Sequence, residues 1–255
     1  MTNFLSPEAG PATLKITRWG GARLAALRGG PELRGAAVGE SWEFSTLPGQ
    51  DSRADGQPLL ASLGAPLPFL AKLIDTALPL SVQVHPGDDA DGPGKEEAWV
   101  VLDADADAHV WAGLAPGQDP AAFRRAVAAG APLLGYLRAI PVVPGSVVLV
   151  PARTVHAIGG GILLAEIQQP RDCTYRFHDH GSARPIQPAQ ALATVDLAAR
   201  PQVWNPGPGA VDLASCSHPT PAVDLHLAAS RSLPVTLRGR HVALEILGPG
   251  AHRRD

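Results

Sequence analysis

A mainly β protein, built as a sandwich or a jelly-roll barrel, is the fold class that the sequence predicts. The longest apolar runs are short and rich in Val, Ile and Leu, as in LSVQV, AWVVL, SVVLV and ILLAEI. The chain also spreads 27 Gly and 26 Pro along its length, so a turn signal follows each run after a few residues. Short strands separated by turns are typical of antiparallel sheets rather than of alternating strands and helices.

The elements follow from these runs in chain order. Strands are expected at 79–86, 98–104, 144–152 and 160–169. Two stretches with helical spacing of their apolar residues, 57–64 and 119–130, predict short helices. In the second helix Asp119 is a suitable N-cap, Pro120 suits the first helical position and Gly130 ends the pattern.

Composition excludes several classes of function. The 255 residues, of which 45% are hydrophobic, can bury a sizeable core as one domain or as one domain with a small companion. The N-terminus MTNFLSPEAG lacks the pattern of a signal peptide, and no apolar run approaches about 18 residues, which argues against a membrane partner. The net charge is -3 and the arginines are scattered, which argues against nucleic acid. Two cysteines are too few for a disulfide framework, so a soluble, cytoplasmic protein is expected.

The chain is expected to divide near residue 199. Residues 1–198 hold the strands described above, and the stretch from Ala199 to Pro219 is rich in turn signals. Two further strand-like runs, AVDLHLAAS and HVALEILGPG, follow it. So short a tail cannot easily form a core alone. We therefore expect a main domain over 1–198 and a linker with a shortened β-domain over 199–255.

Polar residues inside the apolar runs indicate a site. Residues two apart on a strand share a face, so Gln83 and His85 should project side by side. The loop PGDDADGPG is expected to turn the chain back antiparallel and to bring either Glu96 or Glu97 to the same face. A third strand and turn end at His156.

This set predicts a metal centre. One Gln, two His and one Glu form a four-ligand nitrogen and oxygen set that suits zinc, or another divalent first-row ion, at one ion per chain. The alternative is structural, because a single histidine at a strand end is more often a hydrogen-bonded residue than a ligand. The combination favours the metal, since polar groups inside an apolar barrel need a compensating partner.

Longer segments of the sequence resemble a known family. They are RWGGARL, GESWEFS, PFLAKLIDTALPLSVQVHP, GKEEAWVVLDA and VPARTVHAIGGGILLAEIQQPRDCTYRFHD. Together they are similar to class I mannose-6-phosphate isomerases of the short bacterial kind, in the cupin superfamily, from about Trp19 to Asp196. The resemblance implies a cupin jelly-roll β-barrel with a few short helices and a shortened second β-domain at the C-terminus. It also implies interconversion of mannose 6-phosphate and fructose 6-phosphate through an enediol.

The resemblance also implies roles for single residues. The metal ligands fall on Gln83, His85, Glu97 and His156, which selects Glu97 over Glu96. The implied catalytic residues are Arg176 and Lys95. The implied contacts to the hexose 6-phosphate are Ser81, Lys95 and Arg176. Glu40 and Trp42 border the pocket in this family, and Lys72 matches as well.

The general base is left open by the sequence. The candidates are Glu166, Asp179, His178, Lys95 and a metal-bound water. Glu166 can equally well be a strand residue held in a hydrogen-bond network. The two histidines of FHDH can equally well lie in a solvent-exposed turn without a catalytic role.

The chain departs from the family pattern in two motifs. Glu96 replaces a hydroxyl residue, and Arg153 stands where glycine is usual, which has a backbone cost if the turn needs a positive φ. Two alternatives to the isomerase stay open: a cupin isomerase acting on another sugar phosphate, and a non-catalytic cupin that binds sugar phosphates. The shortened C-terminal domain is expected either to pack on the first domain as a remnant or to be completed by pairing into a homodimer.

Overall fold

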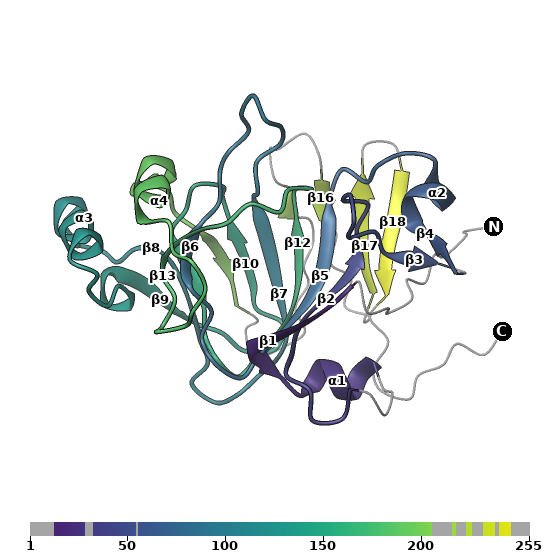
Figure 1. Cartoon of the computed structure of the whole chain (residues 1–255), viewed down its shortest axis with the longest axis horizontal. Coiled ribbons are helices and arrows are strands. Elements are labelled where there is room, and N and C mark those ends of the chain that lie inside the picture. Colours follow the sequence, from purple (N-terminus) through teal and green to yellow (C-terminus); the bar gives the residue numbers. More distant parts are fainter. Residues whose placement is uncertain are drawn as a thin grey trace.

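The computed structural model describes residues 13–28, 33–54 and 56–205, and the backbone of four short strands after them (Figure 1). Its centre consists of two antiparallel sheets. The large sheet contains, in spatial order, β1 (Leu14–Gly21), β2 (Val38–Phe44), β5 (Leu70–Thr76), β12 (Ile162–Gln168), β7 (Glu97–Ala104), β10 (Val147–Val150) and β14 (Gln202–Trp204). The small sheet contains β13 (Tyr175–His178), β6 (Val82–Val84), β11 (His156–Ile158), β8 (His109–Leu114) and β9 (Leu137–Pro141).

Helices and minor sheets complete the described elements. The helices are α1 (Arg23–Arg28), α2 (Leu59–Leu63), α3 (Pro120–Ala128) and α4 (Pro188–Thr194), with a 3₁₀ turn at Leu134–Tyr136. A two-stranded sheet joins β3 (Arg53–Ala54) to β4 (Gln57–Pro58). A four-stranded sheet contains β15 (Cys216–Ser217), β16 (Val223–Leu225), β17 (Ser232–Leu237) and β18 (Arg240–Glu245).

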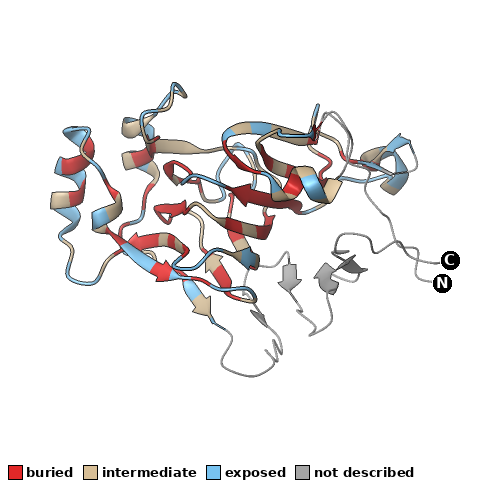
Figure 2. Cartoon of the chain, turned by 90° about the horizontal axis from the view of Figure 1, so that it is seen from below, coloured by how far each residue is buried: buried red, intermediate tan, exposed pale blue. Residues whose placement is uncertain are grey.

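Strand alternation divides the apolar side chains into layers. Trp99 and Val101 of β7 pack with Val110 and Ile158 of the small sheet, so the two sheets face each other across a shared core. Val100, between the first two, points to the opposite side of the large sheet. Figure 2 shows that the buried residues concentrate in the strands.

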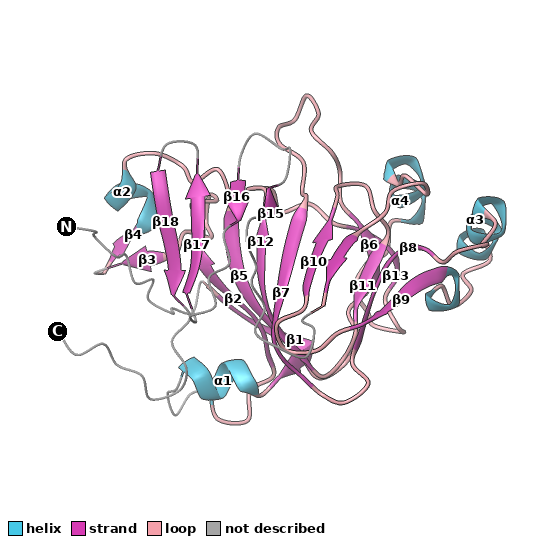
Figure 3. Ribbon diagram, turned by 180° about the vertical axis from the view of Figure 1, so that it is seen from behind, coloured by secondary structure: helices cyan, strands magenta, loops and turns pink. Residues whose placement is uncertain are grey.

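Helices cover the outer faces of both sheets. Leu24 of α1 and Leu59 of α2 pack on the outside of the large sheet. Phe123 of α3 and Ala191 of α4 pack on the outside of the small sheet, and Figure 3 shows both helices at that end of the molecule. This leaves the space between the sheets as the interior in which polar side chains can gather.

The predicted class and its principal elements are confirmed. The fold is mainly β, and β6, β7, β10 and β12 lie at the expected runs. Helix α3 starts as predicted, since the Asp119 carboxylate accepts hydrogen bonds from Ala121 N and Ala122 N at 2.9 and 3.0 Å. The pairings of the described strands keep the two sheets separate.

The predicted hairpin between the runs at 79–86 and 98–104 is wrong. Strand β6 pairs with β11 and β13 in the small sheet, whereas β7 pairs with β12 and β10 in the large sheet. The polar loop between them is long enough to cross from one sheet to the other. Strand β7 is apolar on both faces at Trp99 and Val100, which suits a central strand and not the edge of a hairpin.

The turn before His156 has the strain that the sequence suggested. Arg153 adopts a φ of +66°. A left-handed conformation costs a residue other than glycine about 1–2 kcal/mol. The Arg153 side chain compensates in part, because its Nε donates to the carbonyl of Thr194 at 2.9 Å.

The expected division near residue 199 stays a prediction. Strand β14 lies beyond that point and pairs with β10 in the large sheet. The two predicted strand-like runs overlap β16 and β18, and the rest of both runs lies outside the described residues. Within the described part of the chain, no helix combines the length and apolar character that a membrane span requires.

Candidate metal centre and active-site pocket

The small sheet contributes a row of three polar side chains. Gln83 of β6 lies directly opposite His156 of β11 on one side and Arg176 of β13 on the other. Opposed residues of antiparallel strands place their side chains on the same face. Val82 and Val84 belong to the outer apolar cluster, so this row faces the interior. Gln83 Nε2 lies 3.2 Å from His156 Nε2.

The large sheet contributes a second row. Trp42, Lys72, Glu166 and Trp99 are cross-strand neighbours on β2, β5, β12 and β7. Trp99 Nε1 donates to Glu166 Oε2 at 3.0 Å, and Lys72 Nζ lies 3.4 Å from Glu166 Oε1. Glu97 lies two residues before Trp99 on the same strand, so it shares the inward face.

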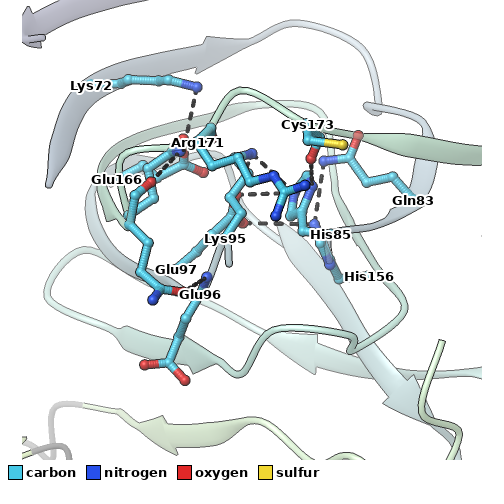
Figure 4. Close-up of polar contacts among 12 residues, drawn as sticks. Lys72, Gln83, His85, Lys95, Glu96, Glu97, His156, Glu166, Arg171 and Cys173 are labelled. Carbon is cyan, nitrogen blue, oxygen red and sulfur yellow. Dashed lines mark hydrogen bonds and ion pairs between the residues drawn. The ribbon is translucent and has the colours of Figure 1, made fainter. Parts of the chain in front are cut away.

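Glu97 meets two histidines across the interior (Figure 4). Its Oε1 lies 3.0 Å from His85 Nε2, and its Oε2 lies 3.6 Å from His156 Nε2. All three side chains are 1% exposed, and one ligand atom from each falls within 4.8 Å of the others. Lys95 Nζ lies beside them, 2.7 Å from Glu97 Oε1 and 3.0 Å from His85 Nε2.

Backbone carbonyls orient both imidazoles toward this point. His85 Nδ1 is 2.8 Å from the carbonyl oxygen of Cys173, and His156 Nδ1 is 2.9 Å from that of Thr154. A carbonyl only accepts hydrogen bonds, so each Nδ1 is the protonated nitrogen. Each Nε2 then presents a lone pair to the interior, which is the arrangement that metal-binding histidines need.

The protonation states also fit a metal. Burial, with Lys95 as the next cause, lowers the pKa of His85 to about 3. Burial likewise lowers the pKa of His156. Burial alone would raise the pKa of Glu97, but the ammonium group of Lys95 holds it well below its usual value. Two neutral imidazoles and one carboxylate are what a divalent cation requires.

The Glu97 carboxylate itself supports this fit. Lys95 lies at ion-pair distance from it, yet neither oxygen accepts a well-aligned hydrogen bond from a described residue. A buried carboxylate with unsatisfied oxygens needs another partner. A nitrogen, nitrogen and oxygen donor set suits zinc. His85, Glu97 and His156 therefore form a group that could hold a metal ion.

A cavity of about 330 Å³ adjoins this group through Gln83 and Lys95, which line the cavity and contact the two histidines. Four residues predicted to form the site line it: Ser81, Gln83, Lys95 and Arg176. Four further residues that the sequence singled out also line it: Glu40, Trp42, Lys72 and Glu166. The lining itself includes neither the three members of the metal group nor Glu96.

Two candidates for the general base are not brought to this cavity. Asp179 lines a neighbouring, larger cavity of about 890 Å³ and pairs with Arg184 at 2.5 Å. His178 lines neither cavity. Burial alone would raise the pKa of Asp179, but Arg184 and Ser182 lower it. Glu166 and Lys95 remain as protein groups at the cavity wall.

The cavity also has lining residues that sequence reasoning missed. The polar and aromatic ones are Lys15, Thr17 and Trp19 on β1, Asp172 and Thr174 before β13, Gln50, and Arg184. A signal existed for most of them. Residues 15, 17 and 19 alternate along a strand, and residues 172 and 174 alternate with Arg176. Such alternation places side chains on one face.

Glu166 should make stability depend on pH. Burial, with the nearby charge of Glu97, raises the pKa of Glu166 to about 7. The folded chain then holds a proton that the unfolded chain releases near pH 4.5, so this contribution to stability is lost as the pH rises from about 4.5 to about 7. Glu166→Gln should remove a decline on the order of 3 kcal/mol. Urea unfolding of both proteins across this range, with a chelator present, tests the point; parallel pH dependences would contradict it.

Together, the two antiparallel sheets and the buried His/Glu/His group define a mainly β protein with a candidate metal site. The chain is 30% identical over 231 residues to the "Probable mannose-6-phosphate isomerase GmuF" of Bacillus subtilis, across 80% of this chain and 71% of that protein. The chain belongs to the mannose-6-phosphate isomerase family. No family model matches it.

Solved structures agree with this fold. The crystal structure of the mannose 6-phosphate isomerase from Bacillus subtilis superposes with a TM-score of 0.68 at 24% identity, covering 91% of this chain and 79% of that one. A mannose 6-phosphate isomerase bound with zinc and yttrium superposes with a TM-score of 0.55 at 15% identity, covering 91% and 82%.

Proposed function

We propose that this chain is a metal-dependent mannose-6-phosphate isomerase, which interconverts mannose 6-phosphate and fructose 6-phosphate through an enediol. The observation that carries the proposal is the buried group of His85, Glu97 and His156, with both Nε2 atoms aimed inward, beside a cavity lined by Lys95 and Arg176. Family membership supplies the substrate.

The ligands in this proposal are His85, Glu97 and His156, with Gln83, whose amide lies beside His156, as the fourth. The zinc-bound relative makes zinc the metal of choice, at one ion per chain. The chemistry that a divalent metal supplies at such a site is polarisation of a substrate oxygen and orientation of the sugar.

Cationic side chains stabilise the negative charge that develops on oxygen and anchor the phosphate. Lys95 stands at the inner end of the cavity next to Glu97, where its ammonium can face an enediolate oxygen. Arg176 offers planar donors, and its buried Nε has no hydrogen-bond partner among the described residues. Ser81 Oγ donates to Gln83 Oε1 at 2.8 Å, which fixes the amide.

Glu166 is the group best suited to move a proton between carbons. Aldose-to-ketose isomerisation takes a proton from C2 and returns one to C1, which needs a base whose pKa is close to the working pH. Burial raises the pKa of Glu166 to about 7, and the side chain lines the cavity. Its hydrogen bond from Trp99 Nε1 fixes the orientation of the carboxylate.

The test is a coupled assay for conversion of mannose 6-phosphate to fructose 6-phosphate. We expect turnover by the zinc-loaded protein, loss of turnover on chelation, and recovery when zinc is returned. A folded, zinc-loaded protein without turnover would contradict the proposal. A panel of hexose and pentose phosphates then tests the alternative substrate, and binding without turnover would favour the non-catalytic module.

The proposal also covers the setting of the enzyme. The small number of cysteines supports a cytoplasmic location. A homodimer and the division into residues 1–198 and 199–255 stay predictions.

A further inference from the structure

Two connecting segments meet beside the metal group. The first is the Lys95 loop, residues 85–96, which joins β6 to β7. The second is the Cys173 segment, residues 169–174, which joins β12 to β13. We propose that Arg171, helped by Gln169, is a positioning residue that ties the two together and so holds Lys95 and His85 in their working places. This inference rests on the proposed isomerase function.

Arg171 spans the tip of the Lys95 loop. Its NH1 donates to Asp89 Oδ1 at 2.9 Å and to the carbonyl oxygen of Pro93 at 3.1 Å. The tip is a tight turn, because Asp89 N donates to the carbonyl oxygen of Gly92 at 3.0 Å. One guanidinium nitrogen therefore binds both limbs of the loop.

Gln169 binds the base of the same loop. Its Oε1 accepts from Glu96 N at 2.9 Å, and its Nε2 donates to Asp88 Oδ1 at 3.0 Å. Its own backbone N donates to the carbonyl oxygen of Glu96 at 3.1 Å. Asp88 also accepts from Gly94 N at 2.6 Å. The neighbours of Lys95 are therefore both held. Gly94 is bound by the Asp88 side chain, and Glu96 is bound by the side chain and the backbone of Gln169.

The loop is closed tightly upon itself. Lys95 N donates to the carbonyl oxygen of Pro86 at 2.9 Å. A Cβ on Gly94 would lie 2.7 Å from the carbonyl carbon of Gly87, so the two limbs touch where Lys95 leaves the loop. Lys95 therefore has little freedom as long as the loop keeps its path.

The Cys173 segment reaches the metal group from its other end. The carbonyl oxygen of Cys173 binds His85 Nδ1 at 2.8 Å, and Asp172 and Thr174 line the cavity. Lys95 Nζ lies 3.0 Å from the other ring nitrogen of His85, Nε2, so His85 links the lysine to the Cys173 segment (Figure 4). A shift of one segment would move both the lysine and the histidine.

The exposure of Arg171 and Asp89 indicates that their ion pair positions the loop and adds little to the stability of the fold. The side chains of Arg171 and Asp89 are 17% and 41% exposed, and ion pairs at such sites add little to folding. The hydrogen bond from Arg171 lowers the pKa of Asp89, so the pair is charged at neutral pH. Loss of the pair should therefore change turnover far more than it changes melting temperature.

The experiment uses the full zinc-loaded chain with Arg171→Met, Asp89→Asn and the double variant. Arg171→Lys keeps a charged nitrogen that can donate to both acceptors. Arg125→Met is the matched control, because it breaks the exposed Arg125–Asp119 pair at 3.3 Å on α3, outside the cavity lining. Hydrogen–deuterium exchange of residues 86–96 is followed without substrate, and kcat and KM are measured separately.

We expect kcat to fall about tenfold to a hundredfold in Arg171→Met, with KM nearly unchanged, because a misplaced lysine acts on the chemical step. Asp89→Asn should show a smaller loss, because asparagine keeps an acceptor oxygen and Arg171 keeps its bond to Pro93. The double variant should lose no more than Arg171→Met, since Asp89 acts through Arg171. Hydrogen–deuterium exchange of residues 86–96 should become faster in these variants. Arg171→Lys should recover part of the lost kcat. The melting temperature of each variant should change by less than about 4 °C.

Other outcomes separate this inference from the proposed function. If the wild type turns over and Arg171→Met matches Arg125→Met in kcat and in exchange, the positioning role is overturned. If the losses of Arg171→Met and Asp89→Asn add up in the double variant, a shared contact is excluded and the inference fails. If the wild type shows no turnover, the proposed function fails, while exchange of residues 86–96 still decides whether Arg171 holds the loop.

Discussion

Replacing Glu97 with glutamine is expected to remove metal binding and turnover together. Glu97 supplies the one carboxylate of the metal group, and the charge of Lys95 would remain 2.7 Å from the substituted position. A neutral amide beside an ammonium group makes the site repel a cation. We expect zinc content after dialysis to fall from about one ion per chain to almost none, with no measurable isomerisation. Metal analysis and the coupled assay measure the two effects.

The matched control for this variant is Glu96→Gln. It removes an adjacent carboxylate of equal charge that lies outside the metal group and the cavity lining. Loss of one partner from a buried pair also costs about 3–5 kcal/mol of stability, so circular dichroism must show that Glu97→Gln is folded. Zinc bound by that folded variant as tightly as by the wild type would rule out Glu97 as a ligand.

Replacing Lys95 with methionine should separate turnover from metal binding. Methionine keeps much of the length of the side chain and removes the charge next to His85 and Glu97. Loss of a preorganised group that stabilises developing charge costs about 10²–10³ in kcat. Zinc should bind at least as tightly as before, because a competing cation next to the carboxylate is gone. Steady-state kinetics at full zinc occupancy and a zinc-competition titration give the two results.

Arg138→Met is the control for the Lys95 variant, since it removes an exposed charge on β9. Unchanged turnover in Lys95→Met would exclude Lys95 from the reaction. Weaker zinc binding in that variant would instead show that the lysine supports the metal group.

Alternation along single strands is the part of this molecule that the sequence predicts well. It places Gln83 on the inner face of β6, and it separates Trp99 from Val100 on β7. The N-cap of α3 is equally local, since Asp119 and its hydrogen bonds lie within one turn. Features of this kind depend on neighbours in the chain, so a single sequence contains them.

Strand partners are what the sequence could not supply. His156 faces Gln83 because β11 pairs with β6, and Lys72 faces Glu166 because β5 pairs with β12. Both pairings join residues far apart in the chain. The wrong hairpin between β6 and β7 has the same origin, because a long polar loop does not reveal whether it returns to the same sheet or crosses to the other.

Lys72 shows how this limits the prediction of a site. In FLAKLID it is the only basic residue of a mostly apolar run, and it is 5% exposed in the fold. Burial alone would lower the pKa of Lys72, but Glu40 and Glu166 raise it above the usual value. Those carboxylates come from β2 and β12, so the partners that make a buried lysine tolerable lie outside its own segment.

The imidazole rings of His85 and His156 are aimed by main-chain oxygens, those of Cys173 and Thr154. Every residue has such an oxygen, so exchanging the side chain at either position leaves the acceptor where it was. The aim of the two rings is therefore encoded in the path of two loops and not in the identity of any single residue. Insertions, deletions or prolines that reroute those loops are the changes through which a descendant of this protein could lose its metal preference while retaining every ligand.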